Sequence, residues 1–275
     1  MDDPKQVPTG IDPTIPSVAR MYDYYLGGKD NFAADREAAE KMIAIGRQMG
    51  NDAREVAREN RGFLGRAVRH LARSGVTQFI DVGAGLPTQE NVHQVAQRHA
   101  PGSRVMYVDN DPVVLIHAQA LLANDQDTAV MRGDLRDPDA IFDDPAVRAH
   151  IDLTRPFAVL LVAVLHFVPE DDAAAAIAAS IRDRLVPGGH LVLSHIYQGE
   201  TEIGDTVAEG QKVYSATSSG GIAGRTLPQI TSFFDGLEIL EPGVVPVQAW
   251  RPDPPWETEV DLSRPGILGA VARKN

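Results

Sequence analysis

The sequence has no cysteine, which excludes disulfide bonds and cysteine-ligated metal centres. It also lacks any apolar run of the roughly 18–20 residues that a membrane-spanning helix needs, and its first residues lack the basic-then-apolar layout of a secretory signal. Basic residues are in deficit, since 26 Lys and Arg face 38 Asp and Glu, for a formal net charge of -12. This balance argues against a broad nucleic-acid surface. We therefore predict a soluble, cytoplasmic protein that binds neither nucleic acid nor membrane.

A phosphate-binding loop is absent as well, although one stretch suggests it. Residues 22–32 read Y-D-Y-Y-L-G-G-K-D-N-F, in which a glycine pair precedes a lysine. A phosphate loop needs a further glycine ahead of that pair and a Ser or Thr after the lysine, but Asp23 and Asp30 occupy these positions. We interpret the stretch instead as the end of a helix that Gly27 and Gly28 close.

Three regions of the chain differ in residue pattern. Residues 1–13 are polar and proline-bearing without periodicity, which predicts a flexible N-terminal arm. Residues 14–74 show helical spacing of apolar side chains, which predicts a helical extension. In residues 75–275 short apolar runs alternate with helical patterns, which is typical of parallel βαβ units with helices on both faces of the sheet. The predicted fold class is therefore α/β.

Ligands of an open parallel sheet bind beyond the carboxyl ends of its strands, so the residues at those ends matter most. The first expected strand ends in F-I-D-V-G-A-G, where Gly83 and Gly85 permit a tight turn and a close approach of the backbone to a ligand. A nicotinamide fingerprint needs a third glycine where Thr88 stands. The Asp81 carboxylate would repel a pyrophosphate but attract an ammonium or sulfonium group. The same turn can also simply close a strand-helix junction.

Acidic residues end the next two expected strands. Asp109 lies at the tip of the second strand, where an acid can accept hydrogen bonds from both ribose hydroxyls of a nucleotide. Asp134 lies at the tip of the third strand, where it can accept a hydrogen bond from an exocyclic amine such as that of adenine. Either residue can also serve as a helix cap or stabilise a turn.

Four short motifs occur in a consistent order: D-V-G-A-G after the first strand, Y-V-D at the second, G-D at the third, and L-V-P-G-G-H-L-V-L before the fifth. Together they resemble the class I S-adenosylmethionine-dependent methyltransferases. The preceding I-P-S-V-A-R-M-Y-D-Y-Y-L-G-G-K-D-N-F is similar to the hallmark of an S-adenosyl methyltransferase family formerly catalogued as a domain of unknown function. With that segment the resemblance covers nearly the whole chain.

The resemblance implies a Rossmann-like sheet of seven strands, mostly parallel, whose last strand over residues 266–272 inserts antiparallel. It also implies S-adenosyl-L-methionine as the cofactor of residues 75–275. Asp81 would contact the amino group of this cofactor, and Asp109 would hold the ribose. The other cofactor contacts that it implies come from Gly83, Ala84, Gly85, Asn110, Asp134, Leu135 and Ala163.

We predict methyl transfer to a small-molecule acceptor without a metal ion. The fourth expected strand ends near Ala163 and His166 with no carboxylate, so a metal-assisted site of the catechol type lacks its obvious ligand. The Asn/Asp-Pro-Pro-aromatic signature of enzymes that methylate amino groups of DNA bases is also missing. His166 is the candidate general base, because imidazole titrates near neutral pH, although such a histidine can also pack or cap a turn. His195 and Tyr197 are secondary candidates.

Two other functions fit parts of the pattern. A non-catalytic protein that binds S-adenosylmethionine or S-adenosylhomocysteine would keep Asp109 and Asp134 without turning anything over. An NAD(P)-dependent oxidoreductase fits less well, because Thr88 replaces the third glycine and Asp81 opposes a pyrophosphate.

The helix expected over residues 17–26 has two distinct faces. Arg20 and Tyr24 share one face, and we predict that they contact the cofactor from a lid within residues 14–74, with Phe32 beside them. Residues 211–225 are a second candidate cover for the substrate. The other helix face, expected to pack against the domain, carries Val18, Met21, Tyr22 and Tyr25.

Overall fold

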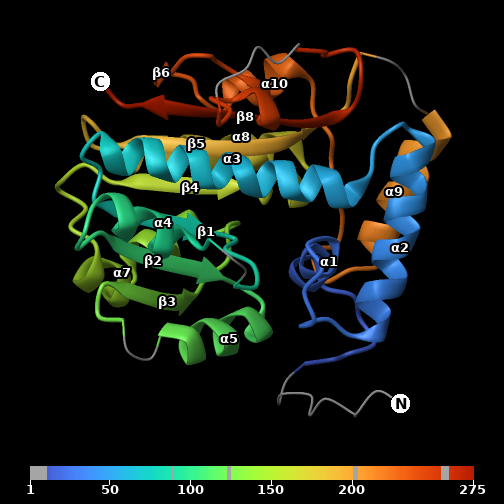
Figure 1. Cartoon of the computed structure of the whole chain (residues 1–275), viewed down its shortest axis with the longest axis horizontal. Coiled ribbons are helices and arrows are strands. Elements are labelled where there is room, and N and C mark those ends of the chain that lie inside the picture. Colours follow the sequence, from blue (N-terminus) through green and yellow to red (C-terminus); the bar gives the residue numbers. More distant parts are fainter. Residues whose placement is uncertain (1–10, 88–89, 123–124, 201–203, 255–259) are drawn as a thin grey trace.

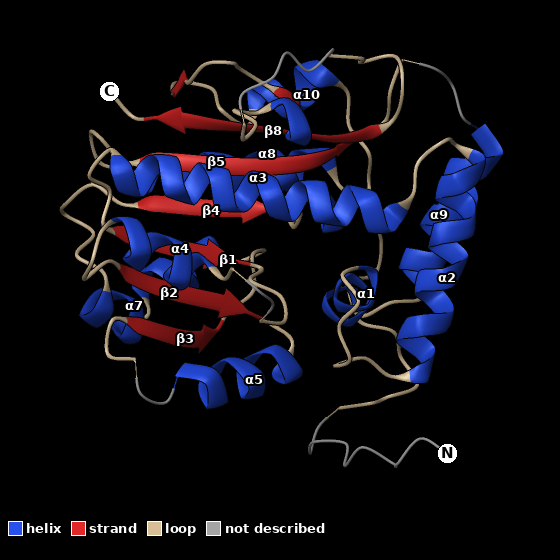
Figure 2. Cartoon of the chain, in the orientation of Figure 1, coloured by secondary structure: helices blue, strands red, loops and turns tan. Residues whose placement is uncertain are grey.

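The computed structural model describes residues 11–87, 90–122, 125–200, 204–254 and 260–275, so Thr88 and most of the predicted arm lie outside the described residues. Helices cover both faces of one mixed β-sheet (Figure 2). Within these ranges no helix is long and apolar enough to cross a membrane. The α/β fold predicted from the sequence is confirmed.

Five parallel strands form the centre of the sheet, in the order β3-β2-β1-β4-β5. The chain order reverses between β1 and β4, which is where ligands of such sheets bind. The strands span Gln78–Val82 (β1), Arg104–Asp109 (β2), Thr128–Arg132 (β3), Ala158–Val162 (β4) and His190–Tyr197 (β5).

Side chains of the central strands alternate between two separate apolar cores. In β1, Phe79 enters one core and Ile80 enters the other, and in β4 the neighbours Leu160 and Leu161 divide in the same way. This alternation follows from the period of two in a strand, and it explains why these strands are almost continuously apolar. Burial on both faces makes the sheet a firm base for the residues at its edge.

Helices α3 and α4 cover one face, and α6, α7, α8 and α10 contribute to the core of the other. The long helix α3 crosses in front of the sheet in Figure 1. The helices of the sheet-bearing part, including α5, are Ala53–Arg73 (α3), Val92–His99 (α4), Pro112–Leu122 (α5), Pro138–Asp143 (α6), Pro145–His150 (α7), Asp171–Arg184 (α8) and Leu227–Ser232 (α10). Short 3-10 turns lie at Leu165–Phe167 (η1) and Val247–Ala249 (η2).

The last strand, β8 (Gly266–Arg273), runs antiparallel to β5 along its length, as predicted. It also pairs with two strands of two residues each, β6 (Glu238–Ile239) and β7 (Val245–Pro246). Among the residues that the structure describes, the sheet therefore has eight strands and not the predicted seven. The additional strand is β7, which pairs with β8 over only two residues.

Three helices stand beyond the carboxyl ends of the parallel strands: α1 (Val18–Tyr25), α2 (Ala33–Gln48) and α9 (Gly204–Ser215) (Figure 1). They share a small third core with α3, to which α1 contributes Met21 and Tyr25 and α9 contributes Tyr214. We call α1, α2 and α9 the cover. The cover thus combines two helices from the start of the chain with one from its later part.

The glycine pair that resembled a phosphate loop forms the corner between α1 and α2. Gly27 has a φ of +81°, a conformation that favours glycine at a helix end. A Cβ on Gly28 would lie 1.9 Å from Oδ1 of Asp23, so this position has no space for a side chain. Asp23 Oδ2 accepts hydrogen bonds from the Asp30 amide at 3.0 Å and from the Asn31 side chain at 2.8 Å. The motif therefore shapes a helix corner.

Candidate functional site

A cavity of about 360 Å³ lies between the carboxyl ends of the central strands and the cover. This volume falls in the range of roughly 300–1,000 Å³ typical of small-molecule sites. Ten residues predicted from the sequence line it together: Asp81, Gly83, Ala84, Gly85, Asp109, Asn110, Asp134, Leu135, Ala163 and His166.

The turn after β1 depends on its two glycines, which both have positive φ angles, +74° at Gly83 and +67° at Gly85. A Cβ on Gly83 would lie 2.3 Å from Cγ2 of Val164, so a side chain cannot fit there. A Cβ on Gly85 would meet no atom within 4 Å, so this glycine leaves open space beside the backbone. The turn therefore gives a ligand access to the main chain.

Asp109 is fixed by backbone donors at the end of β2. Its Oδ2 accepts a hydrogen bond from the Gly85 amide and its Oδ1 accepts one from the Asp111 amide, both at 2.9 Å. Burial raises the pKa of Asp109 to about 6, although these backbone hydrogen bonds oppose the shift. The carboxylate is thus held rigidly at the wall of the cavity.

Asp81 is buried in the middle of the sheet edge, with only 4% of its surface exposed. Its carboxylate makes no hydrogen bond within the described part of the chain, and burial raises its pKa to about 7. The positive charge of Arg61 opposes this shift, and the carboxylate of Asp109 adds to it. A buried acid without a hydrogen-bond donor is poised to accept one from a ligand.

Arg61, on α3, was not identified from the sequence, yet it lines the same cavity. Its Nη2 donates to Oδ1 of Asn91 at 3.0 Å, whereas its Nε is buried without a hydrogen-bond partner in the described structure. Within the described structure, the Asp81 carboxylate and the Arg61 Nε therefore present an acceptor and a donor without partners at one end of the cavity. The period of α3 indicates which face is apolar but not which arginine reaches a strand end 20 residues later.

Asp134 and Arg136 form the more exposed rim beyond β3. Asp134 Oδ1 accepts from the Arg136 amide at 2.9 Å and lies 3.5 Å from Nη1 of the same residue. Arg136 Nη2 also donates to the carbonyls of Phe167 and Ser219, at 3.1 and 3.0 Å. Arg136 therefore connects the loop after β3 to the turn η1 and to the loop after α9 at the edge of the cavity.

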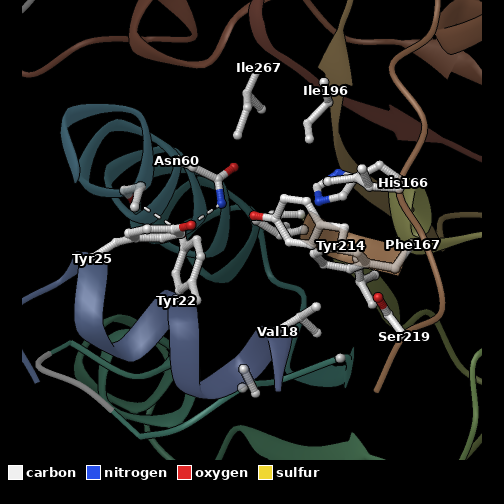
Figure 3. Close-up of a pocket in the computed structure, with 18 of the residues that line it drawn as sticks. Val18, Tyr22, Tyr25, Asn60, His166, Phe167, Ile196, Tyr214, Ser219 and Ile267 are labelled. Atoms are coloured by element: carbon white, nitrogen blue, oxygen red, sulfur yellow. Dashed lines mark hydrogen bonds between the residues drawn. The ribbon is translucent and has the colours of Figure 1, made fainter. Parts of the chain in front are cut away.

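Ala163, directly after β4, has a φ of +56°, a strained conformation for a residue with a side chain. Its amide donates to Oγ of Ser194 at 2.9 Å, and this hydroxyl donates to Oδ1 of Asn60 at 2.6 Å. The Asn60 side chain in turn donates to the Tyr22 hydroxyl at 3.0 Å (Figure 3). A buried hydrogen-bond chain thus connects the strained strand end to the cover helix α1.

His166 lies on the short turn η1 and is almost fully buried. Neither ring nitrogen has a hydrogen-bond partner among the described residues, and Nδ1 is buried. Burial, with the nearby His195 and Arg225, lowers the pKa of His166 well below its usual value. The imidazole is therefore neutral at physiological pH.

The two secondary candidates, His195 and Tyr197, already make hydrogen bonds within the protein. His195 Nδ1 donates to the Ile196 carbonyl at 2.7 Å, so Nε2 is the nitrogen that accepts from Nη1 of Arg225 at 2.8 Å. Burial lowers the pKa of His195 to about 3, and the ring does not line the cavity. Tyr197 does line the cavity, but its hydroxyl donates to the Leu262 carbonyl at 3.0 Å.

The structure places Tyr24 and Arg20 outside the lining of this cavity, contrary to the predicted lid face. The Tyr24 hydroxyl donates to Glu40 on the outer side of the cover. Arg20 Nε donates to Asp35 at 2.8 Å, and its guanidinium lies 5.1 Å from the centre of the Phe32 ring. The face expected to pack against the domain does so, and its Tyr22 and Tyr25 also line the cavity.

Comparisons with known proteins agree with this architecture. A family model described as S-adenosyl methyltransferase matches residues 4–275. A proposed methyltransferase from Thermobifida fusca YX is 39% identical, with a TM-score of 0.88 over 98% of this chain and 99% of its own. A DUF574 family protein from Streptomyces avermitilis MA-4680 is 38% identical, with a TM-score of 0.85 over 96% and 99% of the two chains. No curated protein matches the sequence.

Proposed function

This chain belongs to the S-adenosyl methyltransferase family and is an S-adenosylmethionine-dependent methyltransferase, and from that premise we propose how it works: it transfers the methyl group in line to a small-molecule acceptor without help from a metal ion. The cavity between the strand ends and the cover has a volume of about 360 Å³, which suits a small acceptor. No cluster of three or more potential metal ligands occurs among the described residues. The cytoplasmic location expected from the sequence is part of the same proposal.

The observation that carries the proposal is that Asp81 and Arg61 lie at the same end of the cavity, beside the glycine turn. The methionine part of the cofactor is a zwitterion, and its ammonium group complements the carboxylate of Asp81, which accepts no hydrogen bond from any described residue. Its carboxylate complements Arg61, whose Nε has no partner in the described structure. The open space at Gly85 and the rigid carboxylate of Asp109 would then accommodate the rest of the cofactor.

S-adenosylmethionine supplies a methyl group on a sulfonium, whose leaving group is a neutral thioether. The protein therefore needs to supply mainly position and a dry environment. Asp109 and Asp81 orient the two ends of the cofactor, and the strained peptide of Ala163 is held by Ser194 at the strand end that faces the cavity. His166 orients the acceptor through a neutral imidazole nitrogen. Its lowered pKa makes it a weak base, so proton transfer to it accompanies rather than precedes methyl transfer.

The cover completes the site. We propose that α1, α2 and α9 form the lid, and that α3 belongs to the sheet-bearing body although it falls within residues 14–74. Ser17 donates from its hydroxyl to Oδ2 of Asp111, and the Ser218 amide donates to the Pro16 carbonyl at 3.0 Å. These contacts fasten the cover to the loop after β2 and to the loop after α9.

Two ligands, one with and one without the amino acid part of the cofactor, test the proposed contacts. Asp81→Asn and Arg61→Gln should each weaken S-adenosylhomocysteine binding by about tenfold or more in calorimetry, since each removes a charge-assisted contact. Neither change should affect 5′-methylthioadenosine, which lacks the amino acid part. Asp109→Ala should weaken both ligands by at least about tenfold, because both carry the ribose. Equal losses for both ligands in the Asp81 variant would contradict the assignment of the methionine end.

Turnover separates an enzyme from a non-catalytic binder. A binder would be stabilised by S-adenosylhomocysteine but would release no methyl group to any acceptor. An oxidoreductase would instead be stabilised by NADH and not by S-adenosylhomocysteine. For the methyltransferase, S-adenosylhomocysteine at about 100 times its dissociation constant should add about 2.7 kcal/mol to the free energy of unfolding, a shift of several degrees in Tm.

A further inference from the structure

We propose that the methyl acceptor is an uncharged, ring-bearing molecule that presents a hydroxyl or amine hydrogen to His166. This inference rests on the proposed function, because it concerns the part of the cavity that the cofactor would leave free. We call this part the acceptor chamber. It is bounded by α1, α2, α9, η1 and β8, with Tyr22, Tyr25, Met42, Ile45, Met49, His166, Phe167, Ile196, Gln211, Tyr214, Ile222 and Ile267 in its walls.

Charged side chains that line the cavity gather at its cofactor end, and Arg136, which approaches the chamber, has its guanidinium held by the Phe167 and Ser219 carbonyls. The charged residues lie on α3 or at and just beyond the ends of β1, β2 and β3, and none of the described residues that line the acceptor chamber is Asp, Glu, Lys or Arg. A charged acceptor would therefore lose its hydration without meeting an opposite charge, which is strongly unfavourable. The six charged lining residues are Arg61, Asp81, Asp109, Asp111, Asp134 and Arg136.

Aromatic rings from three elements surround the chamber. Phe167 and Tyr214 lie 5.6 Å apart between ring centres with their planes tilted by 47°, and Phe167 lies 4.5 Å from the ring of His166. In Figure 3, Tyr22 and Tyr25 of α1 face this group across the cavity, with Asn60 between the two sides. Rings arranged around an apolar space favour a flat, apolar guest with ring-to-ring contacts.

Hydrogen bonding in the chamber points to a donor on the acceptor. Asn60 already makes two hydrogen bonds, since it accepts from Ser194 and donates to Tyr22, whose hydroxyl donates to the Ala57 carbonyl at 3.0 Å. His166, in contrast, has no partner among the described residues and is neutral. A neutral imidazole offers one nitrogen lone pair, so an acceptor with an O–H or N–H group would satisfy it.

The balanced step follows from this contact. A lone pair on the acceptor oxygen or nitrogen forms a bond to the methyl carbon, and the carbon–sulfur bond breaks with its electron pair going to sulfur. The hydrogen of the acceptor leaves as a proton through His166 to solvent. The products are the methylated acceptor, S-adenosylhomocysteine and a proton.

Three naphthalene ligands of similar shape test the proposal on the protein saturated with S-adenosylhomocysteine. At pH 7, 2-naphthol is uncharged, 2-naphthoate is an anion and 2-naphthylmethylamine is a cation. We expect 2-naphthol to bind in calorimetry and both charged ligands to bind at least about 100-fold more weakly, because the chamber offers no counter-charge. Absence of 2-naphthol binding at millimolar concentration, or equal binding of 2-naphthoate, overturns the proposal.

A charge placed in the chamber provides the reciprocal test. Met42→Lys puts an ammonium group on the chamber wall of α2, and it should raise the affinity for 2-naphthoate by at least about tenfold. Gln48→Lys adds the same charge to α2 at an exposed position outside the lining and should leave 2-naphthoate binding unchanged. Equal gains in both variants would show a general charge effect and overturn the proposal.

The cofactor measurement separates the two levels of inference. If the wild-type protein does not bind S-adenosylhomocysteine, the proposed function itself fails. If it binds S-adenosylhomocysteine but does not distinguish the three naphthalene ligands, only the acceptor assignment fails.

Discussion

At the scale of single residues, the cofactor end of the cavity is defined by two carboxyl groups that burial makes hard to ionise. Burial raises the pKa of Asp81 to about 7 and that of Asp109 to about 6. These shifts oppose the ionised form in the free protein, and a bound ammonium group and bound hydroxyls would restore it. These raised pKa values are consistent with the ammonium and ribose contacts that we propose, and in the free protein both carboxyl groups carry the cost of burial.

This electrostatic arrangement predicts that S-adenosylhomocysteine affinity depends on pH. The ligand stays zwitterionic between pH 5 and 7.5, whereas the free carboxyl groups take up protons as the pH falls through about 7 and then about 6. Binding then requires their ionisation, so affinity should be highest above pH 7 and fall by up to about tenfold per pH unit for each protonated group.

Calorimetry from pH 5 to 7.5 measures this dependence. Asp81→Asn removes the group that titrates near pH 7, so the variant should retain only the fall below about pH 6. An affinity of the wild-type protein that does not change over this range would contradict the ionic role of both residues.

At the scale of elements, helix α1 connects the cover to both ends of the cavity. Its N-terminal Ser17 bonds to Asp111, two residues after Asp109, for which we propose a contact to the ribose, while Tyr22 joins the hydrogen-bond chain to Ala163. One short helix thus contacts the loop after β2 and, through Asn60, the end of β4. A movement of α1 would therefore alter the hydrogen bonds at the loop after β2 and at the end of β4.

Removal of the Ser17 hydroxyl should loosen this cover. Ser17→Ala deletes the hydrogen bond to Asp111, and a loss of about 1 kcal/mol should speed S-adenosylhomocysteine release roughly fivefold in stopped-flow experiments. Thr14→Ala is the matched control, because the Thr14 hydroxyl donates only to the exposed Asp12. Equal release rates in wild type and Ser17→Ala would show that α1 does not retain the ligand.

At the scale of the whole molecule, a sheet buried on both faces carries a cover that has its own small core. Strands β1 and β4 share two cores, whereas α1 and α2 depend on a cluster that includes α9. Local stability should therefore differ between the sheet and the cover. The cover is the part that can open for exchange of ligands without disturbing the sheet.

Hydrogen exchange should reveal this difference. In the free protein, amides of α1 and α2 should exchange faster than those of β1 and β4, and S-adenosylhomocysteine should slow exchange in α1 by at least about tenfold. Helix α7, at the opposite end of the sheet in Figure 1, provides a local control whose fraying should not change. Protection of α7 equal to that of α1 would indicate global stabilisation without closure of the cover.

The sequence by itself determined the parallel sheet and the residues at the edge where its strands end. Alternating apolar strands and helices predict a parallel sheet from local periodicity, and each strand end then identifies the residues that follow it, as with Gly83, Asp109 and Asp134. The order of the motifs also identified the family to which the chain belongs. These features are local in the chain, so a single sequence carries them.

Only the tertiary structure decided which side chains the cover and α3 turn toward that edge. The helical period separated Tyr24 from Tyr22 and Tyr25 correctly but assigned the cavity to the wrong face, because a cover helix packs its apolar face around the cavity itself. Arg61 was not identified from the sequence for a related reason. Its neighbours Asp81 and Asn91 are remote in sequence and lie near it because α3 packs on the sheet. Contacts between distant segments depend on the three-dimensional arrangement of whole elements, which local residue patterns do not encode.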